Sequence, residues 1–480
     1  MKNTHSNPNN EVNSPILTPL MTGISSPDPL KFAFAVKSSP HAGRSGSHPL
    51  DLSPQQWQSW WATPTSATQR ALYIHIPFCR KRCSFCNFFE NGSNSARISR
   101  YVESLSQQLY TASKTPFVKS GTFDTVYVGG GTPTDMQASE IAIIGEAIQA
   151  FPLAKNAEIT LEGRLNDFTD AKFDAALASG FNRFSFGVQS FNTQVRLAAG
   201  RFDNREVLIE RLQELSKHPS ASIVADLIFG LPGQTMEIWL QDLQDVIQSS
   251  VHGVDLYQLI GLQGTRLSKQ AEKEKAKQTQ EDGSQQKQQT LVPAVDSQTR
   301  ASMYAAGARL LESSGWQRLS SCHWRRDNRE RSIYNSLAKS GIEILPFGAG
   351  AGGNIHGHGM MNARDLSNWH QAQTPDSVTD TLPLRVPGMV MSPNPSAALD
   401  SQFKAGLDHG ELVLSEFDTE MVDHLMPLFY AWQTNGLVKI SDKIMTQTLA
   451  GRFWNVNLQT GLFAYLNQNA FESCASSMST

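Results

Sequence analysis

The sequence has no excess of charge of either sign. Its 480 residues include 41 Lys and Arg and 44 Asp and Glu, which give a formal net charge of −3. A protein without a general positive field is poorly suited to hold nucleic acid or an anionic membrane surface. We therefore expect neither nucleic acid nor a membrane among its partners.

Long apolar runs are also missing. The longest apolar stretches, such as residues 223–231, are about half the length that a membrane-spanning helix needs. The segment MKNTHSNPNNEV at the amino terminus has no apolar core of the kind found in secretory signal peptides. These features predict a cytoplasmic protein without a membrane span.

Cysteine is scarce, and its five copies are too few and too odd in number for a disulfide framework. Three of them, Cys79, Cys83 and Cys86, lie within eight positions. A closed structural zinc site usually takes four protein ligands, and the next cysteine, Cys322, lies far along the chain. Three thiolates would leave one iron of a 4Fe-4S cluster open, so the pattern favours a cluster that binds a small molecule.

The loop that carries these thiols is basic. Arg80, Lys81 and Arg82 stand between the first two cysteines, and positive charge lowers the pKa of a thiol and offsets the charge of a thiolate-ligated cluster. Buried structural thiols are the weaker interpretation, since three unrelated core cysteines seldom gather on a polar loop. For His75, just before the loop, we expect a hydrogen-bonding role in the core rather than ligation.

Short β-prone runs alternate with helical patterns from residue 71 onward, which predicts βα units and a parallel sheet. The expected strands cover residues 71–76, 125–128, 157–161, 183–187, 222–229 and 254–260. The expected helices cover residues 98–112, 139–150, 170–179, 204–215, 236–249, 299–313 and 419–435. Because eight βα units close a barrel, six predict an α/β fold with an incomplete, open (β/α)6 barrel that can admit a large substrate.

Composition divides the chain into four expected parts. Residues 1–69 are rich in Ser, Pro, Asn and Gly and predict a loosely ordered arm, with one aromatic island at residues 57–61. Residues 70–268 contain the expected barrel, and the Gln, Lys and Glu tract at 269–296 predicts a linker or insertion. Residues 297–480 predict a mainly helical domain that ends in a small winged-helix-like module, and we expect this module to pack over the mouth of the barrel.

The spacing C-x3-C-x2-C after the strand YIHIPF resembles the radical S-adenosylmethionine (SAM) superfamily, in which the open iron binds SAM and cluster reduction cleaves it to a radical. The motifs GGGTPT, GVQSFN and DLIFGLP then follow, similar in order to the coproporphyrinogen-dehydrogenase-like branch. They lie at expected carboxyl ends of strands, where ligand sites form. The resemblance implies a 4Fe-4S cluster on Cys79, Cys83 and Cys86, and SAM contacts at Tyr73, Gly129, Gly130, Thr132, Glu162, Gln189, Arg201 and Asp226.

Three tetrapyrrole functions compete within that branch. Coproporphyrinogen enzymes carry a fourth cysteine two positions after the third, where this chain has Phe88, and the chaperone-like members commonly have an acidic residue where this chain has Asn87. The segments CSFCNFFENGS and TLEGRLNDF are most similar to the haem-utilisation radical SAM proteins. This resemblance implies a SAM-dependent methyltransferase that opens the porphyrin ring of haem without oxygen and releases iron and a linear tetrapyrrole.

Two alternatives stay open beside haem degradation. One is a haem-binding chaperone or transfer protein with a SAM and cluster site, and the other is an oxygen-independent coproporphyrinogen III dehydrogenase. For an enzyme with such a cluster, a flavodoxin-like protein is the expected electron donor.

A Gly-rich segment at residues 345–364 offers candidate haem contacts. Its histidines and methionines carry groups suited to axial ligation of haem, and an arginine suits a propionate. The residues concerned are His356, His358, Met360, Met361 and Arg364. An ordinary flexible turn with incidental histidines is the alternative. A further candidate substrate-facing patch lies at residues 322–326, where Cys322 is expected to be a packing thiol.

Overall fold

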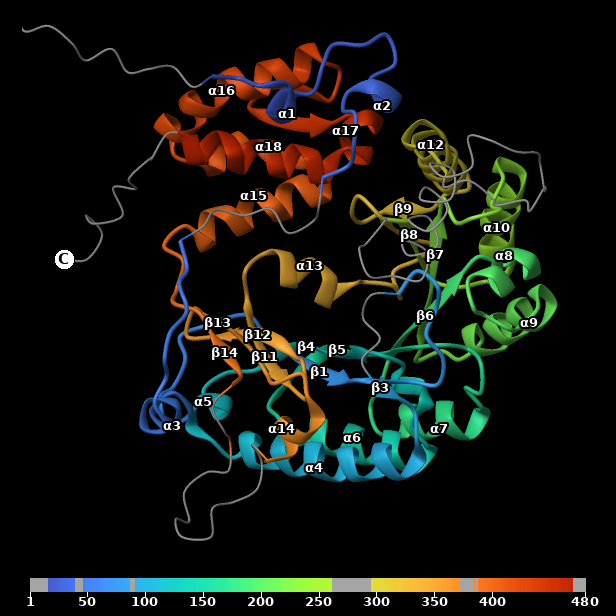
Figure 1. Cartoon of the computed structure of the whole chain (residues 1–480), viewed down its shortest axis with the longest axis vertical. Coiled ribbons are helices and arrows are strands. Elements are labelled where there is room, and N and C mark those ends of the chain that lie inside the picture. Colours follow the sequence, from blue (N-terminus) through green and yellow to red (C-terminus); the bar gives the residue numbers. More distant parts are fainter. Residues whose placement is uncertain are drawn as a thin grey trace, which may run out of the picture. The chain divides into compact units, whose positions relative to one another are not determined.

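The computed structural model describes residues 16–38, 46–86, 91–260, 295–371, 384 and 387–468. It contains two compact units, Ser45–His409 and Met1–Arg44 with Gly410–Thr480 (Figure 1). Most of the tract predicted as a linker at residues 269–296 lies outside the described residues. Within the part of the chain that is described, no helix is both long enough and apolar enough to cross a bilayer.

The larger unit is built on a nine-stranded sheet with the order β11-β1-β4-β5-β6-β7-β8-β10-β9. Seven neighbouring strands run parallel: β1 Arg70–Ile76, β4 Phe123–Gly130, β5 Leu153–Gly163, β6 Arg183–Gln189, β7 Ser222–Phe229, β8 Gly253–Gln258 and β11 Glu343–Phe347. Two short strands, β10 His323–Arg325 and β9 Gln317–Arg318, add antiparallel to the far edge. The open parallel sheet with six predicted strands is confirmed, and strands from both sides of the 269–296 tract share it.

Helices follow the strands and lie along the outer side of this sheet (Figure 1). They are α4 Ser95–Ser113, α5 Pro116–Lys119, α6 Ala138–Gln149, α7 Asp170–Ala178, α8 Thr193–Ala198, α9 Arg205–Ser216, α10 Met236–Gln248 and α12 Ser297–Ser313. The short helix η1, Pro133–Asp135, follows the glycine run at the end of β4. Several begin at a side chain that accepts a hydrogen bond from the first turn, as Asn94 does for α4 and Asn204 for α9. In α4 the buried residues recur at three and four, which gives one apolar face toward the sheet.

The inner face of the sheet is polar. Because side chains alternate along a strand, Tyr73, Tyr127, Glu162, Asp226 and Asp255 all point to this one face. The short helix α13, Ile333–Lys339, contacts β4 and brings a further tyrosine onto this face. The open barrel therefore presents hydrogen-bonding side chains, rather than a closed apolar core, to whatever enters it.

Several smaller elements complete the larger unit. They are α3 Pro54–Ala62, β2 Phe78–Cys79, β3 Asn91–Gly92, β12 Gly352–Ile355, β13 His358–Met361, α14 Leu366–Gln371, β14 Met389–Val390 and α15 Ala397–His409. Within the stretch predicted as a loose arm, α3 starts with a capping box at Ser53 and buries Trp57 and Trp61. The ring of Trp61 lies 5.7 Å from that of Phe117, so this part of the arm is packed.

The smaller unit combines segments from both ends of the chain. Its elements are α1 Pro19–Thr22, α2 Pro29–Phe32, β15 Glu411–Val413, η2 Leu414–Glu416, α16 Thr419–Thr434, β16 Val438–Ser441, β17 Ile444–Gln447, α17 Leu449–Phe453 and α18 Asn455–Gln468. The three strands form one antiparallel sheet in the order β15-β17-β16. The indole N–H of Trp432 donates to the carbonyl of Met21 at 2.8 Å, which ties the early segment to α16.

Candidate cluster and cofactor site

Three cysteines lie on one loop that follows the carboxyl end of β1. Cys79 ends the short strand β2, and the amide of Cys86 donates to the carbonyl of Cys83 at 3.3 Å, which turns the loop back on itself. Cys79 and Cys83 are buried and Cys86 is half-buried. The fold thus brings all three thiols to the edge of the sheet where parallel α/β proteins bind ligands.

Two guanidinium groups lie beside Cys83. Arg164 Nη2 donates to Cys83 Sγ at 3.4 Å and to the carbonyl of Lys81 at 3.0 Å. Arg201 also hydrogen-bonds to Cys83, and its buried Nε has no partner. Burial lowers the pKa of Arg201, whereas the thiol raises it. Positive charge at this position stabilises thiolates and the anionic cluster that thiolates would hold.

The thiol of Cys79 has a less favourable setting in the protein alone. Burial raises its pKa, while the hydroxyl of Thr132, 3.2 Å from Cys79 Sγ, and the charge of Arg164 lower it. A metal ion deprotonates a coordinating thiol because its charge outweighs such desolvation. Thr132 is therefore placed to hydrogen-bond the sulfur of a cluster ligand.

The donor set fits an iron–sulfur cluster better than a single metal ion. Among the residues that the structure describes, no three His, Cys, Asp or Glu side chains converge on one ion. In a cubane cluster each cysteine binds a different iron atom, so its ligands do not need to converge. Three thiols on one loop, with the guanidinium groups of Arg164 and Arg201 beside Cys83, suit such a cluster.

The glycine run at the end of β4 fits tightly against this loop. A Cβ on Gly129 would lie 2.6 Å from Glu162 Oε2, and a Cβ on Gly131 would lie 2.4 Å from the carbonyl oxygen of Phe78. Gly130 has φ of 113°, and its amide donates to the Glu162 carboxylate. Only glycine allows this close approach of the backbone.

The predicted SAM contacts on β5 and β7 carry carboxylates with raised pKa values. Burial raises the pKa of Glu162, while hydrogen bonds from Tyr127 and Gly130 oppose that shift. Burial, with the negative charges of Asp255 and Glu162, raises the pKa of Asp226 to about 8. Such raised values are typical of carboxyl groups that bind a ligand or a proton.

Gln189 and Arg201 meet above the backbone of Gly187. A Cβ on Gly187 would lie 2.5 Å from Gln189 Nε2 and 3.3 Å from Arg201 Nη2. Gln189 itself has φ of 72°, where the register between β6 and β7 shifts. A left-handed backbone at a residue other than glycine often marks a functional position. The structure thus gathers the predicted cluster and SAM residues at one edge of the sheet.

Tyr73 and His75 link this edge to the inner face. Tyr73 Oη lies 2.8 Å from His75 Nδ1, while the buried His75 Nε2 has no partner. Burial lowers the pKa of His75 to about 4, and the charge of Arg364 acts in the same direction. Of the candidate haem contacts, Arg364 therefore lies near the carboxyl end of β1.

The structure does not bring His356 and His358 to that edge. His356 Nε2 lies 3.1 Å from the carbonyl oxygen of Trp60, and the ring of His358 lies 4.3 Å from that of Trp60. The His356 amide donates to Glu343, which begins β11 at the opposite, amino-terminal end of the strands. Met360 pairs with Gly353 in a hairpin and is buried.

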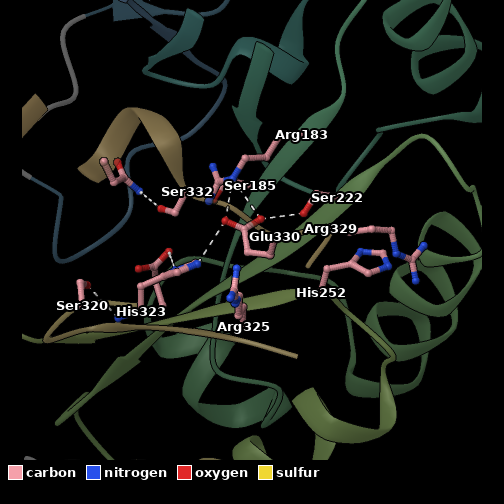
Figure 2. A network of polar contacts seen from close by, with 12 residues as sticks. Arg183, Ser185, Ser222, His252, Ser320, His323, Arg325, Arg329, Glu330 and Ser332 are labelled. Atoms are coloured by element: carbon pink, nitrogen blue, oxygen red, sulfur yellow. Dashed lines mark hydrogen bonds and ion pairs between the residues drawn. The ribbon is translucent and has the colours of Figure 1, made fainter. Parts of the chain in front are cut away.

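A buried ion-pair network on the inner face was not predicted from the sequence (Figure 2). Glu330 accepts from Arg183 Nε at 3.0 Å and from Ser222 Oγ at 2.6 Å. His323 pairs with Glu330 at 3.2 Å through Nε2 and with Asp255 at 3.0 Å through Nδ1. The run of charged residues around position 326 was visible in the sequence, but nothing local indicated its partners on the sheet.

A tyrosine stack lies on the same face and was also missed. The ring of Tyr334 from α13 lies 4.7 Å from that of Tyr127 and 6.2 Å from that of Tyr73. The amide of Tyr334 donates to Glu158 Oε1 at 3.2 Å. These contacts hold α13 against the strands that carry the predicted SAM residues.

Comparisons with known proteins agree with this geometry. The family model described as the radical SAM superfamily matches residues 73–246. An anaerobilin synthase of Escherichia coli O157:H7 is 34% identical over 85% of this chain and 87% of its own length. A heme chaperone of Buchnera aphidicola is 33% identical, over 39% of this chain and 50% of its own length. The structure of coproporphyrinogen III oxidase from Escherichia coli has the same fold, with a TM-score of 0.69, 21% identity and coverage of 87% of this chain and 95% of that one.

Proposed function

Because the chain belongs to the radical SAM superfamily and, within it, to the family of anaerobilin synthase, we propose that it is a SAM-dependent enzyme that degrades haem without oxygen. The proposed reaction methylates and opens the porphyrin ring and yields iron and a linear tetrapyrrole. The observation that carries the choice of substrate is the likeness to anaerobilin synthase along 85% of this chain. The loop of three thiols supports the radical chemistry.

In this proposal Cys79, Cys83 and Cys86 hold the 4Fe-4S cluster, which supplies the electron that cleaves SAM. Arg164 and Arg201 offset its negative charge from beside Cys83. Each of the three cysteines is required, since a missing thiolate frees a second iron and changes the cluster.

The remaining predicted residues bind and orient SAM. The glycine run at the end of β4 exposes backbone where a side chain would collide, and Glu162 is fixed by hydrogen bonds from Tyr127 and the Gly130 amide. Gln189 and Arg201 meet above Gly187 and can hold one end of the cofactor. Asp226 receives a hydrogen bond from Ser185 Oγ at 3.0 Å, which fixes its carboxyl group on the inner face.

The electron donor and the compartment belong to the same proposal. A cluster of this kind takes electrons singly, which suits a flavodoxin-like donor. We place the protein in the cytoplasm, where it would meet haem taken up by the cell.

The test is anaerobic incubation of the cluster-loaded protein with SAM, dithionite and haem, followed by mass spectrometry of the tetrapyrrole and of the SAM products. We expect a ring-opened, methylated tetrapyrrole together with 5′-deoxyadenosine. Cys79→Ala, Cys83→Ala and Cys86→Ala should each abolish both products. Cys474→Ala, at a cysteine outside the loop, is the matched control and should keep them. Turnover retained in any loop variant contradicts the proposal.

The same assay separates the two alternatives. Intact haem that is bound and passed on while SAM stays uncleaved would indicate a haem chaperone, the function named for a relative that matches 39% of this chain. Loss of carboxyl groups from coproporphyrinogen III would instead indicate the dehydrogenase, the function suggested by the shared fold. Neither outcome is expected if haem is the substrate that reacts.

A further inference from the structure

An exposed, positively charged face lies directly over the cysteine loop. Lys81 is exposed on that loop, and its ammonium group lies 3.9 Å from the centre of the Phe202 ring. Phe202 is 55% exposed and Leu197, near the end of α8, is 46% exposed. We call Lys81, Arg82, Arg164, Leu197 and Phe202 the loop face. Aromatic and aliphatic groups of this size at the surface, beside cations, are typical of interaction sites.

Only a short stretch of backbone separates the loop face from the buried thiol of Cys83. A Cβ added to Gly200 would lie 3.6 Å from Cys83 Cα, and the amide of Ser84 donates to the carbonyl of Ala199 at 3.2 Å. Arg164 spans the loop, with its guanidinium 3.4 Å from Cys83 Sγ. A molecule resting on the loop face would thus be one backbone layer away from a cluster ligand.

Three of the five residues of the loop face are positively charged, namely Lys81, Arg82 and Arg164. Arg80 at its rim is balanced by Asp135, at 3.4 Å, and by Asp167. Lys81 forms no ion pair with any carboxylate in the described ranges, and Arg82 donates to the carbonyl of Cys86 at 3.4 Å. The whole chain has a net charge of −3, so this positive face stands out locally.

We propose that the loop face is the docking site of the protein that reduces the cluster, and that this partner is a small acidic one-electron carrier. The inference rests on the proposed function, because only a cluster on these cysteines needs such a partner. The step moves one electron from the reduced carrier, which is oxidised, to the cluster, which is reduced, and no bond is made or broken. Transient redox complexes are small, and charge complementarity speeds their formation.

The apolar and charged parts of the loop face have separate roles in this proposal. Lys81 attracts the acidic carrier from a distance, an effect that salt weakens because the charge is exposed. Phe202 and Leu197 then exclude water from the contact, which brings the carrier close to the loop. Both roles are properties of the complex and not of SAM binding.

The experiment compares Lys81→Glu and Phe202→Glu with Lys155→Glu in the cluster-loaded full chain. Lys155 is exposed near the amino-terminal end of β5, at the edge of the sheet opposite the loop, so the control makes the same charge change elsewhere. Binding of purified flavodoxin is measured by calorimetry at low and high salt. SAM cleavage is measured once with flavodoxin, kept reduced by its NADPH-dependent reductase, and once with dithionite.

We expect both loop-face variants to bind flavodoxin about tenfold more weakly at low salt and to lose most of the salt dependence, with a matching fall in the flavodoxin-driven rate. The dithionite-driven rate of Phe202→Glu and the binding by Lys155→Glu should stay unchanged. If both loop-face variants bind flavodoxin as tightly as the wild type, the docking site is wrong. It is also wrong if the rate of SAM cleavage by Phe202→Glu falls equally with flavodoxin and with dithionite. If the wild-type protein binds flavodoxin but gives no ring-opened tetrapyrrole with dithionite, the proposed haem chemistry is contradicted and the docking site is not.

Discussion

The Glu330 carboxylate contacts three partners on the inner face of the sheet. Arg183 and Glu330 are 2% and 0% exposed, and their ion pair at 3.0 Å is joined by Ser222 and His323 (Figure 2). Moving charges out of water is costly, and a pair repays that cost only when further hydrogen bonds satisfy it. Burial alone would raise the pKa of Glu330, but Arg183 first, and then His323 and Ser222, lower it below its usual range, so the carboxylate stays charged. These residues stiffen the inner face beneath the predicted SAM site.

His323 makes the stability of this network depend on pH. Burial alone would lower its pKa, but Asp255 and Glu330 raise it to about 10. A histidine whose pKa is raised in the folded state contributes stability that is full below its unfolded pKa and is lost as the pH rises through the folded one. Between pH 8 and 9 the folded protein therefore holds one proton more at this site than the unfolded chain.

We expect the free energy of unfolding to fall by about 1.4 kcal/mol per pH unit in that interval because of His323. Asp226, whose raised pKa of about 8 acts in the same direction, adds to the slope near pH 8. The difference in slope between the wild type and a variant at position 323 therefore gives the part that is due to His323. Urea unfolding at pH 8.0, 8.5 and 9.0, followed by tryptophan fluorescence, measures the slope. His323→Asn should flatten it, with His218→Asn at a half-exposed position as the control. An equal slope in wild type and His323→Asn would contradict the ion pairs.

Residue type and residue position were predictable to different degrees. The three cysteines were found because their spacing places them on one loop, so no long-range contact had to be known. His356 and His358 have the chemistry of haem ligands, yet they lie beside Trp60 at the other end of the strands. Their location depends on how a hairpin packs against α3, and residue chemistry does not reveal this.

At the scale of elements, local periodicity predicted the six central strands and failed for the seventh. β11 contains Pro346, which pairs with Tyr73 in a parallel ladder, and proline argues against a strand in a sequence. The edge strands β9 and β10 are only two and three residues long. Such strands are defined by the neighbours they pair with, and those neighbours are distant along the chain.

Gly130, the last residue of β4, allows a test of whether the glycine run belongs to the cofactor site. We expect Gly130→Ala to weaken SAM binding at least about tenfold, because φ of 113° is unfavourable for alanine and its Cβ would lie 2.6 Å from His75 Cε1. Gly315→Ala is the matched control, since φ there is 83° and no atom lies within 4 Å of the added Cβ. It should cost only about 1 kcal/mol of stability.

Calorimetry with SAM and thermal unfolding of both variants separate the two effects. If both variants lose stability and Gly130→Ala keeps its affinity for SAM, the glycine run serves folding alone. A loss of SAM affinity confined to Gly130→Ala supports its place in the cofactor site. His75 is the neighbour that would have to move, so its ring contact with Tyr73 is the first that the variant disturbs.

At the scale of the whole molecule, the two ends of the chain fold into one unit. Composition predicted a loose arm for residues 1–69, because Ser, Pro and Asn dominate it. The described residues 16–38 nevertheless contact the carboxy-terminal helices: Trp454 Nε1 donates to the carbonyl of Leu30 at 3.0 Å, and Gly461 leaves room for the backbone of Met21. These contacts join residues that are more than 400 positions apart in the chain, and local composition does not reveal them.

Deleting residues 1–38 should therefore loosen the smaller unit and leave the larger one intact. The indole N–H of Trp432 loses its partner, the carbonyl of Met21, and a buried donor without a partner costs about 1–3 kcal/mol. Amide hydrogen exchange in α16 and α18 should speed up about tenfold or more, while α10 in the larger unit keeps its protection. Deletion of residues 1–15 is the control, because every contact named for this segment survives it. Equal protection of α16 and α18 in the two deletions would mean that the carboxy-terminal helices fold without the early segment, and the smaller unit would then consist of residues 410–468 alone.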